Sequence, residues 1–177
     1  INRRALGAEM RYFDAGMTLY GLVDYDLSFK DINIMMAQVN YRLEDGTNFF
    51  AVLDRRKTPP LALTSALMGN PCVMSVKELV STLGIDEVRR QATAMAAESS
   101  MFSIGFTRPV TPRWQLGADY RLASISSSEG TLTMPGQPGT GNSHVISGQA
   151  IGTGLFREND VLVGNTSLIH APTYNGQ

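Results

Sequence analysis

The chain has 177 residues, with 15 basic and 16 acidic side chains and a net charge of −1, which excludes the basic excess of a nucleic-acid-binding protein. Its length allows one domain with a sizeable core. Charged residues make up only 18% of the chain and hydrophobic residues 43%, yet no run approaches the roughly 20 apolar residues of a transmembrane helix. This combination is typical of a transmembrane β-barrel, whose strands have one apolar and one polar side.

An alternation of apolar and polar residues with period two dominates the chain and predicts β-strands with two unlike faces. It is clear in four runs and weaker in three others, and a last candidate is ambiguous. Most runs approach the roughly 9–11 residues that a tilted membrane strand needs, and together they predict about eight strands. In chain order the runs are 8–13, 18–27, 34–43, 48–56, 102–107, 114–122, 146–156 and 161–170.

The alternation also predicts which positions face lipid and which line a lumen, because a slip of one residue would put charges on the apolar face. The lipid-facing positions are expected to be Leu19, Val23, Tyr25, Met35, Val39, Tyr41, Phe49, Leu53, Phe106, Trp114, Leu116 and Tyr120. The lumen-lining positions are expected to be Asp24, Asp26, Gln38, Asn40, Arg42, Asp54, Arg56, Asp119 and Arg121. Because the lumen residues carry both signs of charge, strong ion selectivity is not expected.

Turn-forming residues separate the predicted strands. Five connections are short and polar: 14–16, 28–31, 44–46, 111–113 and 157–160. A helical insert is expected at about 61–100, and a flexible loop rich in Ser, Gly, Thr and Pro at about 126–143. In an up-and-down barrel both long connections then lie on one side of the membrane. This matches the long extracellular loops and short periplasmic turns of outer-membrane barrels.

Two helices are expected inside the insert. Ser75 and Glu78 have the spacing of a capping box, and Gly84 follows as a stop signal. Asp86 is expected to cap a second helix that runs to about Glu98. This helix has one apolar stripe and could cap the barrel, plug its lumen or dock a partner, and capping needs the fewest assumptions.

Aromatic residues give a further sign of a membrane boundary. Tyr12, Tyr41, Phe49, Phe106 and Trp114 all occupy apolar positions near the short-turn ends of the predicted strands. An aromatic girdle at the periplasmic interface would have this placement.

No residue pattern predicts catalysis in the lumen. Asp24 and Asp26 share one face and could act as paired carboxylates. The simpler interpretation is that both line a polar lumen and are neutralised by Arg42 or Arg56 on neighbouring strands, because paired charges usually have a structural explanation.

The histidines and the cysteine also receive structural interpretations. His144, Ser147 and Asp119 could in principle form a hydrolase set, but Ser147 lacks a nucleophile-elbow pattern. His144 is more simply a surface residue beside the flexible loop, and His170 is interpreted in the same way. With only these two histidines and Cys72 as the single cysteine, no disulfide, metal site or cofactor is expected. Cys72 is expected to be a small packing residue.

A short basic cluster, Asp54-Arg55-Arg56-Lys57, lies at the long-connection end of its predicted strand. It could contact lipopolysaccharide phosphates at the outer rim of a barrel, or it could simply be solvated at the membrane boundary. Outer-membrane lipid and lipopolysaccharide are therefore the expected surroundings, and no nucleic-acid partner is expected.

Several short motifs, spread over most of the chain, form a set that resembles one known family. They are Tyr12-Phe13-Asp14, Leu22-Val23-Asp24-Tyr25-Asp26, Asp54-Arg55-Arg56 with Pro60-Leu61 and Ala66-Leu67, the Pro- and Gly-rich 136–142, and Gly154-Leu155-Phe156 with Asn159-Asp160. This set resembles the C-terminal β-barrel of large, poorly characterised proteobacterial outer-membrane proteins whose N-terminal part often carries tetratricopeptide-like repeats. The resemblance implies a periplasmic helical-repeat region or export machinery as a partner, by fold-level analogy with exopolysaccharide export, and it defines no active site.

The sequence therefore predicts an all-β chain with a small helical insert. Residues 1–177 are expected to form a segment of an antiparallel up-and-down transmembrane β-barrel, or an arc of a larger barrel, in the bacterial outer membrane. The first residues lack the features of a signal peptide, so we expect an excerpt of a longer exported protein. A passive or export-related pore is the expected function, and an enzyme is not. The alternatives are a structural or surface-interaction barrel with a filled lumen and a soluble β-sandwich binding module.

Overall fold

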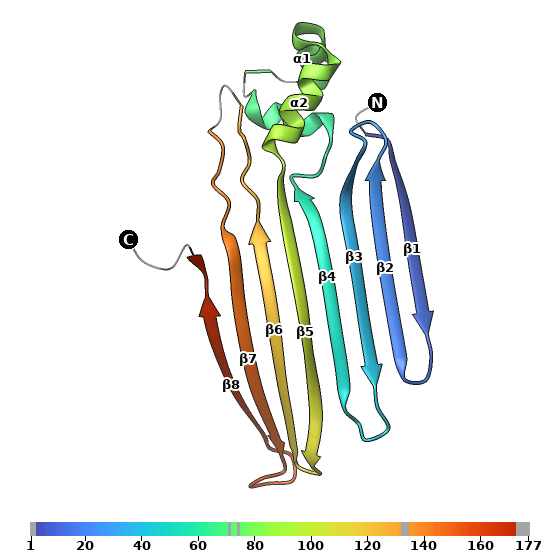
Figure 1. Cartoon of the computed structure of the whole chain (residues 1–177), viewed down its shortest axis with the longest axis vertical. Coiled ribbons are helices and arrows are strands. Elements are labelled where there is room, and N and C mark those ends of the chain that lie inside the picture. The colour runs from blue at the N-terminus through green and yellow to red at the C-terminus, as the bar shows by residue number, and fades with distance from the viewer. Residues whose placement is uncertain (1–2, 71, 74, 132–134, 173–177) are drawn as a thin grey trace.

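Eight strands form a single antiparallel sheet in the computed structural model, which describes residues 3–70, 72–73, 75–131 and 135–172. Each strand pairs with its neighbours in the sequence, so the order in the sheet is the order in the chain (Figure 1). This confirms the predicted all-β, up-and-down architecture. The strands are β1 (Ala5–Phe13), β2 (Met17–Asp26), β3 (Asp31–Arg42), β4 (Asn48–Thr58), β5 (Ala97–Thr111), β6 (Trp114–Ile125), β7 (Gly141–Thr153) and β8 (Val161–His170).

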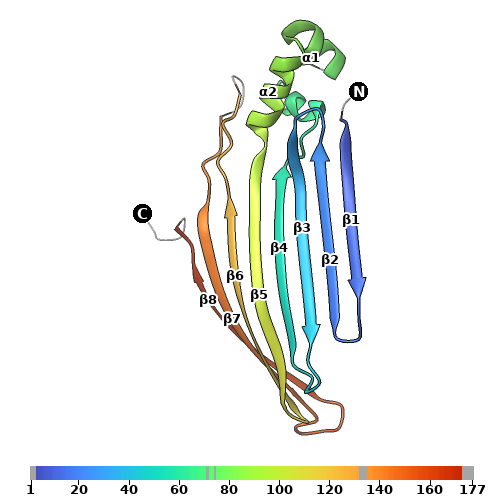
Figure 2. The ribbon, with the colours of Figure 1, turned by 45° about the vertical axis from the view of Figure 1, so that its right-hand side comes forward.

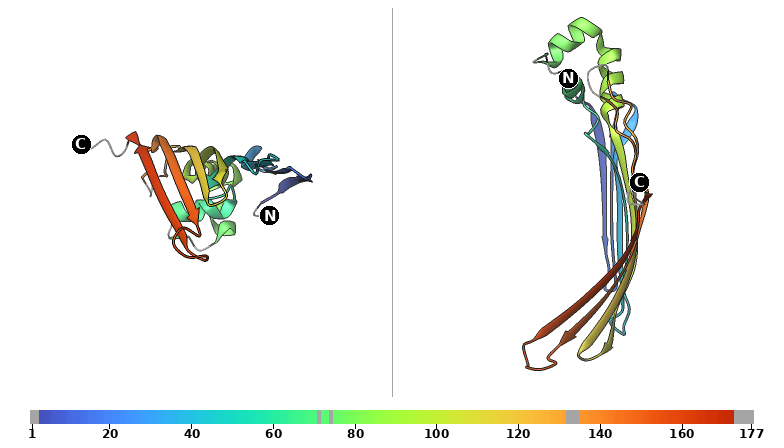
Figure 3. Two further views of the ribbon diagram at one scale, coloured as in Figure 1. Left: turned by 90° about the horizontal axis from the view of Figure 1, so that it is seen from below. Right: turned by 90° about the vertical axis from the view of Figure 1, so that its left-hand side faces the viewer.

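The sheet is open, because β1 and β8 form its two edges and do not pair with each other. The strands stand side by side along the long axis of the molecule, and the lower halves of β5–β8 sweep to one side (Figure 2, Figure 3). Such coiling follows from the twist of antiparallel strands. The sheet therefore has the shape of an arc of a barrel and not of a closed cylinder.

The connections alternate between the two ends of the sheet. The short connections 14–16, 43–47, 112–113 and 154–160 lie at one end, and 27–30, 59–96 and 126–140 lie at the other (Figure 1). The prediction that both long connections share one end is confirmed.

Asp160 holds the last short turn together. Its carboxylate accepts the backbone N–H groups of Leu155 and Phe156, each at 2.7 Å, and of Arg157 at 3.1 Å. Burial raises the pKa of Asp160, but the hydrogen bonds to its charged form outweigh burial and leave the pKa below its ordinary value. The carboxylate thus stays charged where it caps the turn.

The helical insert stands at the long-connection end and contains the 3-10 helix η1 (Leu63–Gly69), α1 (Val76–Leu83) and α2 (Ile85–Met95). Its small hydrophobic core consists of Leu63, Ala66, Leu79, Val88 and Ala92. As predicted, the Ser75 hydroxyl accepts the N–H of Glu78, at 3.2 Å, and Gly84 ends α1. Of the helices in the described part of the chain, none has the length and apolar character needed to cross a membrane.

Two boundaries of the insert differ from the prediction. Gly84, and not Asp86, is the residue that caps α2, and Asp86 lies in the first helical turn. The helix ends at Met95 and not near Glu98, because Glu98 already pairs with Lys57 in the β4–β5 ladder. The insert expected at 61–100 is therefore shorter, and β5 extends further toward the long-connection end than its alternation indicates.

The loop expected at 126–143 is shorter than predicted and is partly held by hydrogen bonds. Strand β7 begins at Gly141, so 141–143 belong to the sheet. Glu129 and Gly130 donate their backbone N–H groups to the carbonyl of Ala94 in α2, at 3.1 and 3.3 Å. Gly130 also forms a bridge with Pro135, while residues 132–134 lie outside the described part. The loop thus contacts the insert above the sheet.

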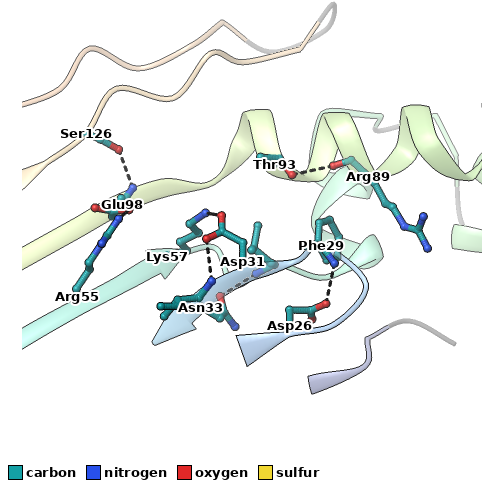
Figure 4. Close-up of polar contacts among 12 residues, drawn as sticks. Asp26, Phe29, Asp31, Asn33, Arg55, Lys57, Arg89, Thr93, Glu98 and Ser126 are labelled. Atoms are coloured by element: carbon teal, nitrogen blue, oxygen red, sulfur yellow. Dashed lines mark hydrogen bonds and ion pairs between the residues drawn. The ribbon is translucent and has the colours of Figure 1, made fainter. Parts of the chain in front are cut away.

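A β-bulge joins the insert to the sheet. Asp24 pairs with Ile34 but Tyr25 pairs with Ile32, so Asn33 is skipped in the β2–β3 ladder. Asn33 is 1% exposed, and its side-chain oxygen accepts the N–H of Leu61 at 3.0 Å (Figure 4). Leu61 is itself fully buried, so this bond fixes the start of the insert against β3.

Replacing Asn33 with Ala should loosen the insert, because the buried N–H of Leu61 then loses its acceptor at a cost of about 1–3 kcal/mol. We expect faster amide hydrogen exchange and faster proteolysis within residues 59–96. The matched control is Asn40→Ala, which removes a 3.4 Å bond between the half-buried side chains of Asn40 and Thr18 and should leave the insert unchanged. Equal protection of the insert in both variants would contradict this role for Asn33.

Candidate functional site

One face of the sheet is apolar across all eight strands. Cross-strand pairing continues each row of side chains from strand to strand, and much of this face is open to solvent. Ile146 is 56% exposed and Leu168 is 74% exposed. All the positions predicted to face lipid share this face, although its contact with lipid stays a prediction. A row through its middle contains Val39, Ala51, Ile104, Tyr120, Ile146 and Leu168.

Aromatic side chains border the apolar face at the short-connection end. Phe49 pairs with Tyr41 on one side and with Phe106 on the other. The rings of Phe49 and Phe106 have centroids 6.1 Å apart and a tilt of 41°, within the range of favourable aromatic pairs. At the opposite end a polar row closes the face and contains Arg55, Ser100, Ser124 and Asn142. The apolar face therefore has an aromatic border and a polar border.

The opposite face carries the positions predicted to line a lumen, and we call it the polar face. By register it contains Asp24, Asp26, Gln38, Asn40, Arg42, Asp54, Arg56, Asp119 and Arg121. Tyr20, Met36 and Phe50 lie on the same face, so it is mixed and not uniformly polar. Contact of the nine predicted positions with a lumen stays a prediction.

A glycine makes room for the large side chains of the polar face. A Cβ atom at Gly105 would lie 2.7 Å from the Cβ of Asp119 and 2.7 Å from a ring carbon of Phe50. Gly105 pairs with both residues across the two neighbouring ladders. The absence of a side chain at Gly105 thus lets Phe50 and Asp119 approach each other from either side of β5.

Arg3 neutralises the two carboxylates of β2, and not Arg42 or Arg56 as expected. Arg3 forms an ion pair with Asp24, and its Nε donates to Asp26 at 3.3 Å. Asp26 is fully buried and also accepts the N–H groups of Ser28 and Phe29, at 2.8 and 3.0 Å (Figure 4). Asp26 therefore shapes the β2–β3 turn, and its side chain has no contact with solvent.

The basic cluster at the end of β4 is neutralised by carboxylates. Arg55 donates to Glu98 at 2.7 Å, and Lys57 pairs with Asp31 (Figure 4). Arg56 pairs with Asp54 on its own strand. Each of the three basic side chains thus has a carboxylate partner, and contact of the cluster with lipopolysaccharide phosphates stays a prediction.

The charged side chains of β6 on the polar face differ from those of β2 and β4, because they have no partner among the described residues. In the described part of the chain, Asp119 and Arg121 form no side-chain hydrogen bond or ion pair. Asp119 borders a hollow of about 300 Å³ together with polar side chains of β7 and β8. The other polar residues that line the hollow are Ser147, Gln149, Asn165, Thr166 and Ser167.

The structure separates the residues of the hydrolase set. Asp119 and Ser147 are cross-strand partners on the polar face, whereas His144 pairs with Leu122 and points to the apolar face. Ser147 and His144 are thus on opposite sides of the sheet and cannot exchange a proton. His144 lies within β7, and it pairs directly with His170.

Within the described ranges, no group of three or more His, Cys, Asp or Glu side chains has the arrangement of a metal site. Cys72 is exposed and so does not pack inside the insert as expected. The residues that sequence reasoning missed are Arg3, which precedes the first strand, and the His144–His170 pair, whose contact depends on the β7–β8 register. Comparisons of the chain with protein-family models, with curated proteins and with solved structures gave no match.

Proposed function

We propose that the chain forms part of the wall of a bacterial outer-membrane β-barrel whose lumen is a passive or export-related pore. The observation that carries the proposal is the apolar face that continues over eight strands with large side chains exposed. Soluble monomers rarely expose contiguous apolar patches larger than a few hundred Å². Lipid acyl chains are the occupant that this face requires, because lipid can cover a broad curved apolar surface without specific contacts.

The borders of the apolar face and the connections support one orientation. The aromatic row with Tyr41, Phe49 and Phe106 lies at the short-connection end, where an interfacial girdle would meet the periplasmic headgroups. The helical insert and the 126–140 connection lie at the other end (Figure 1). In this proposal they are extracellular, and the insert caps the rim of the barrel.

The two edges of the sheet set a condition for this function. Unpaired backbone N–H and C=O groups within the hydrocarbon region cost several kcal/mol each. Strands β1 and β8 must therefore be paired in the membrane, with each other or with further strands. They run in opposite directions, so each can continue an antiparallel ladder (Figure 1).

The fold bears on the two alternative functions, a barrel with a filled lumen and a soluble β-sandwich. A barrel with a filled lumen is favoured by the large side chains of Tyr20, Met36 and Phe50 on the polar face. A soluble β-sandwich receives no support, because all eight described strands lie in one sheet. No second sheet among the described residues covers the apolar face.

Adjacent residues of β7 test whether the apolar face meets lipid. Ile146→Arg places a charge on that face, and Ser147→Arg places the same charge on the polar face. In bilayers the first change should lower the free energy of unfolding of the full-length natural protein by about 2–4 kcal/mol, and the second by much less. Urea titration followed by heat-modifiable gel mobility measures the difference. Equal effects of both changes, or a protein that stays soluble without detergent, would overturn the membrane proposal.

Planar-bilayer conductance separates an open pore from a filled barrel. An open pore should conduct with weak ion selectivity, because the polar face carries both signs of charge. Asp119→Asn removes an unpaired negative charge and should shift the reversal potential in a salt gradient toward anion preference. Asp26→Asn is the control, since this carboxylate is buried in a turn. Absence of conductance in the folded, inserted protein would favour the filled barrel.

A further inference from the structure

We propose that His144 and His170 form a cross-strand binding site for a divalent transition-metal ion of the Cu²⁺, Ni²⁺ or Zn²⁺ class. The inference rests on the β7–β8 pairing and not on the membrane function, so either proposal can fail without the other. The two residues are 26 positions apart in the sequence by their numbers, yet they are direct partners in the antiparallel ladder.

The geometry places two imidazole rings next to each other on one face of the sheet. Directly opposed residues of an antiparallel pair have Cβ atoms about 4.5–5.5 Å apart. The ring centroids of His144 and His170 are 6.2 Å apart, and the rings are tilted by 36°. This separation leaves room for one ion between the rings, bound by one nitrogen of each ring at the usual metal–nitrogen distance of about 2.0–2.1 Å.

Tyr120 prepares His144 for metal binding. The Tyr120 hydroxyl lies 2.8 Å from Nδ1 of His144. A phenol oxygen can accept a hydrogen bond from Nδ1–H, which leaves the lone pair of Nε2 free for a metal ion. A metal-binding histidine generally donates its other ring N–H in this way, and such a partner fixes the ring and raises its basicity. Tyr120 is thus a positioning residue, and His144 and His170 are the ligands.

The surroundings select the kind of ion. The site lies one row of cross-strand partners away from Ser124 and Asn142, at the polar border of the apolar face. His170 is exposed, so water can complete the coordination sphere. No third His, Cys, Asp or Glu joins the pair within the described ranges. A neutral nitrogen site without carboxylates disfavours Mg²⁺ and Ca²⁺, which need oxygen ligands, and favours Cu²⁺ most strongly.

Because the site lies at the end of the edge strand β8, a bound ion would affect how firmly this strand is held. Strand β8 is an edge of the sheet and is paired only with β7 in the described part of the chain. An ion held by both histidines would connect the last residue of β8 to β7. Metal binding should therefore slow amide exchange in the upper part of β8.

The test uses the detergent-solubilised full-length chain without a histidine tag, titrated with Cu²⁺ by calorimetry and examined by electron paramagnetic resonance. We expect one ion per chain with two imidazole nitrogens in the spectrum. His170→Gln should weaken binding and leave one nitrogen. Tyr120→Phe should weaken binding about tenfold while both nitrogens remain, because it removes only the partner of Nδ1.

Ser147→Ala is the matched control, because Ser147 is in the same strand but on the opposite face, and it should bind Cu²⁺ like the unaltered chain. Circular dichroism of each variant checks that the sheet is intact. Equal Cu²⁺ affinity of the unaltered chain and the folded His170→Gln variant would overturn the site. So would a one-nitrogen spectrum of the unaltered chain.

Discussion

The continuous register of the eight-stranded ladder is the constraint on which the rest of the structure depends. Side chains alternate between faces with period two, so a slip of one residue in any ladder would exchange the two faces beyond that point. Apart from shifts at Asp24/Tyr25 and Pro109/Thr111, both near strand ends, seven consecutive ladders keep one apolar face and one more polar, mixed face across the sheet. The observed pairing of His144 with His170 requires this register, and so do the proposed lipid contact and the proposed lumen wall.

The bulge in the β2–β3 ladder shows how the sheet carries an insert, because the register shifts only next to the turn and is regular along the rest of both strands. Skipping Asn33 turns its amide inward, where it holds Leu61 at the start of the insert. The buried carboxylate of Asp26 fixes the adjacent turn. Both groups are polar and almost wholly buried, and their oxygen atoms accept backbone N–H groups, whereas the side-chain nitrogen of Asn33 has no partner among the described residues. The insert therefore depends on side chains of the sheet as well as on its own small core.

The sequence was sufficient to predict the strands, the parity of the connections and the membership of the two faces, because period-two alternation is a local property. It was not sufficient for partners that depend on register or rotamers. Arg3 was outside every predicted strand, and the Arg55–Glu98 pair joins residues 43 positions apart. Residues 97–101 lacked a clear alternation because charged and small polar residues fill both faces there. The histidine pair was missed for the same reason as the ion pairs, since a contact between β7 and β8 cannot be read from either strand alone.

The distribution of charge over the polar face follows from where the backbone needs support. Near the insert, the carboxylates of Asp24, Asp26 and Asp31 are each bound by a basic side chain, and this is where turns and the insert must be held. On β6, by contrast, Asp119 and Arg121 sit within regular ladders that need no such support, and they are unpaired among the described residues. Paired charges cancel at short range, whereas unpaired charges act on a mobile ion that passes near them. In the proposed pore, the unpaired charges of β6 are therefore the ones that would act most strongly on a passing ion.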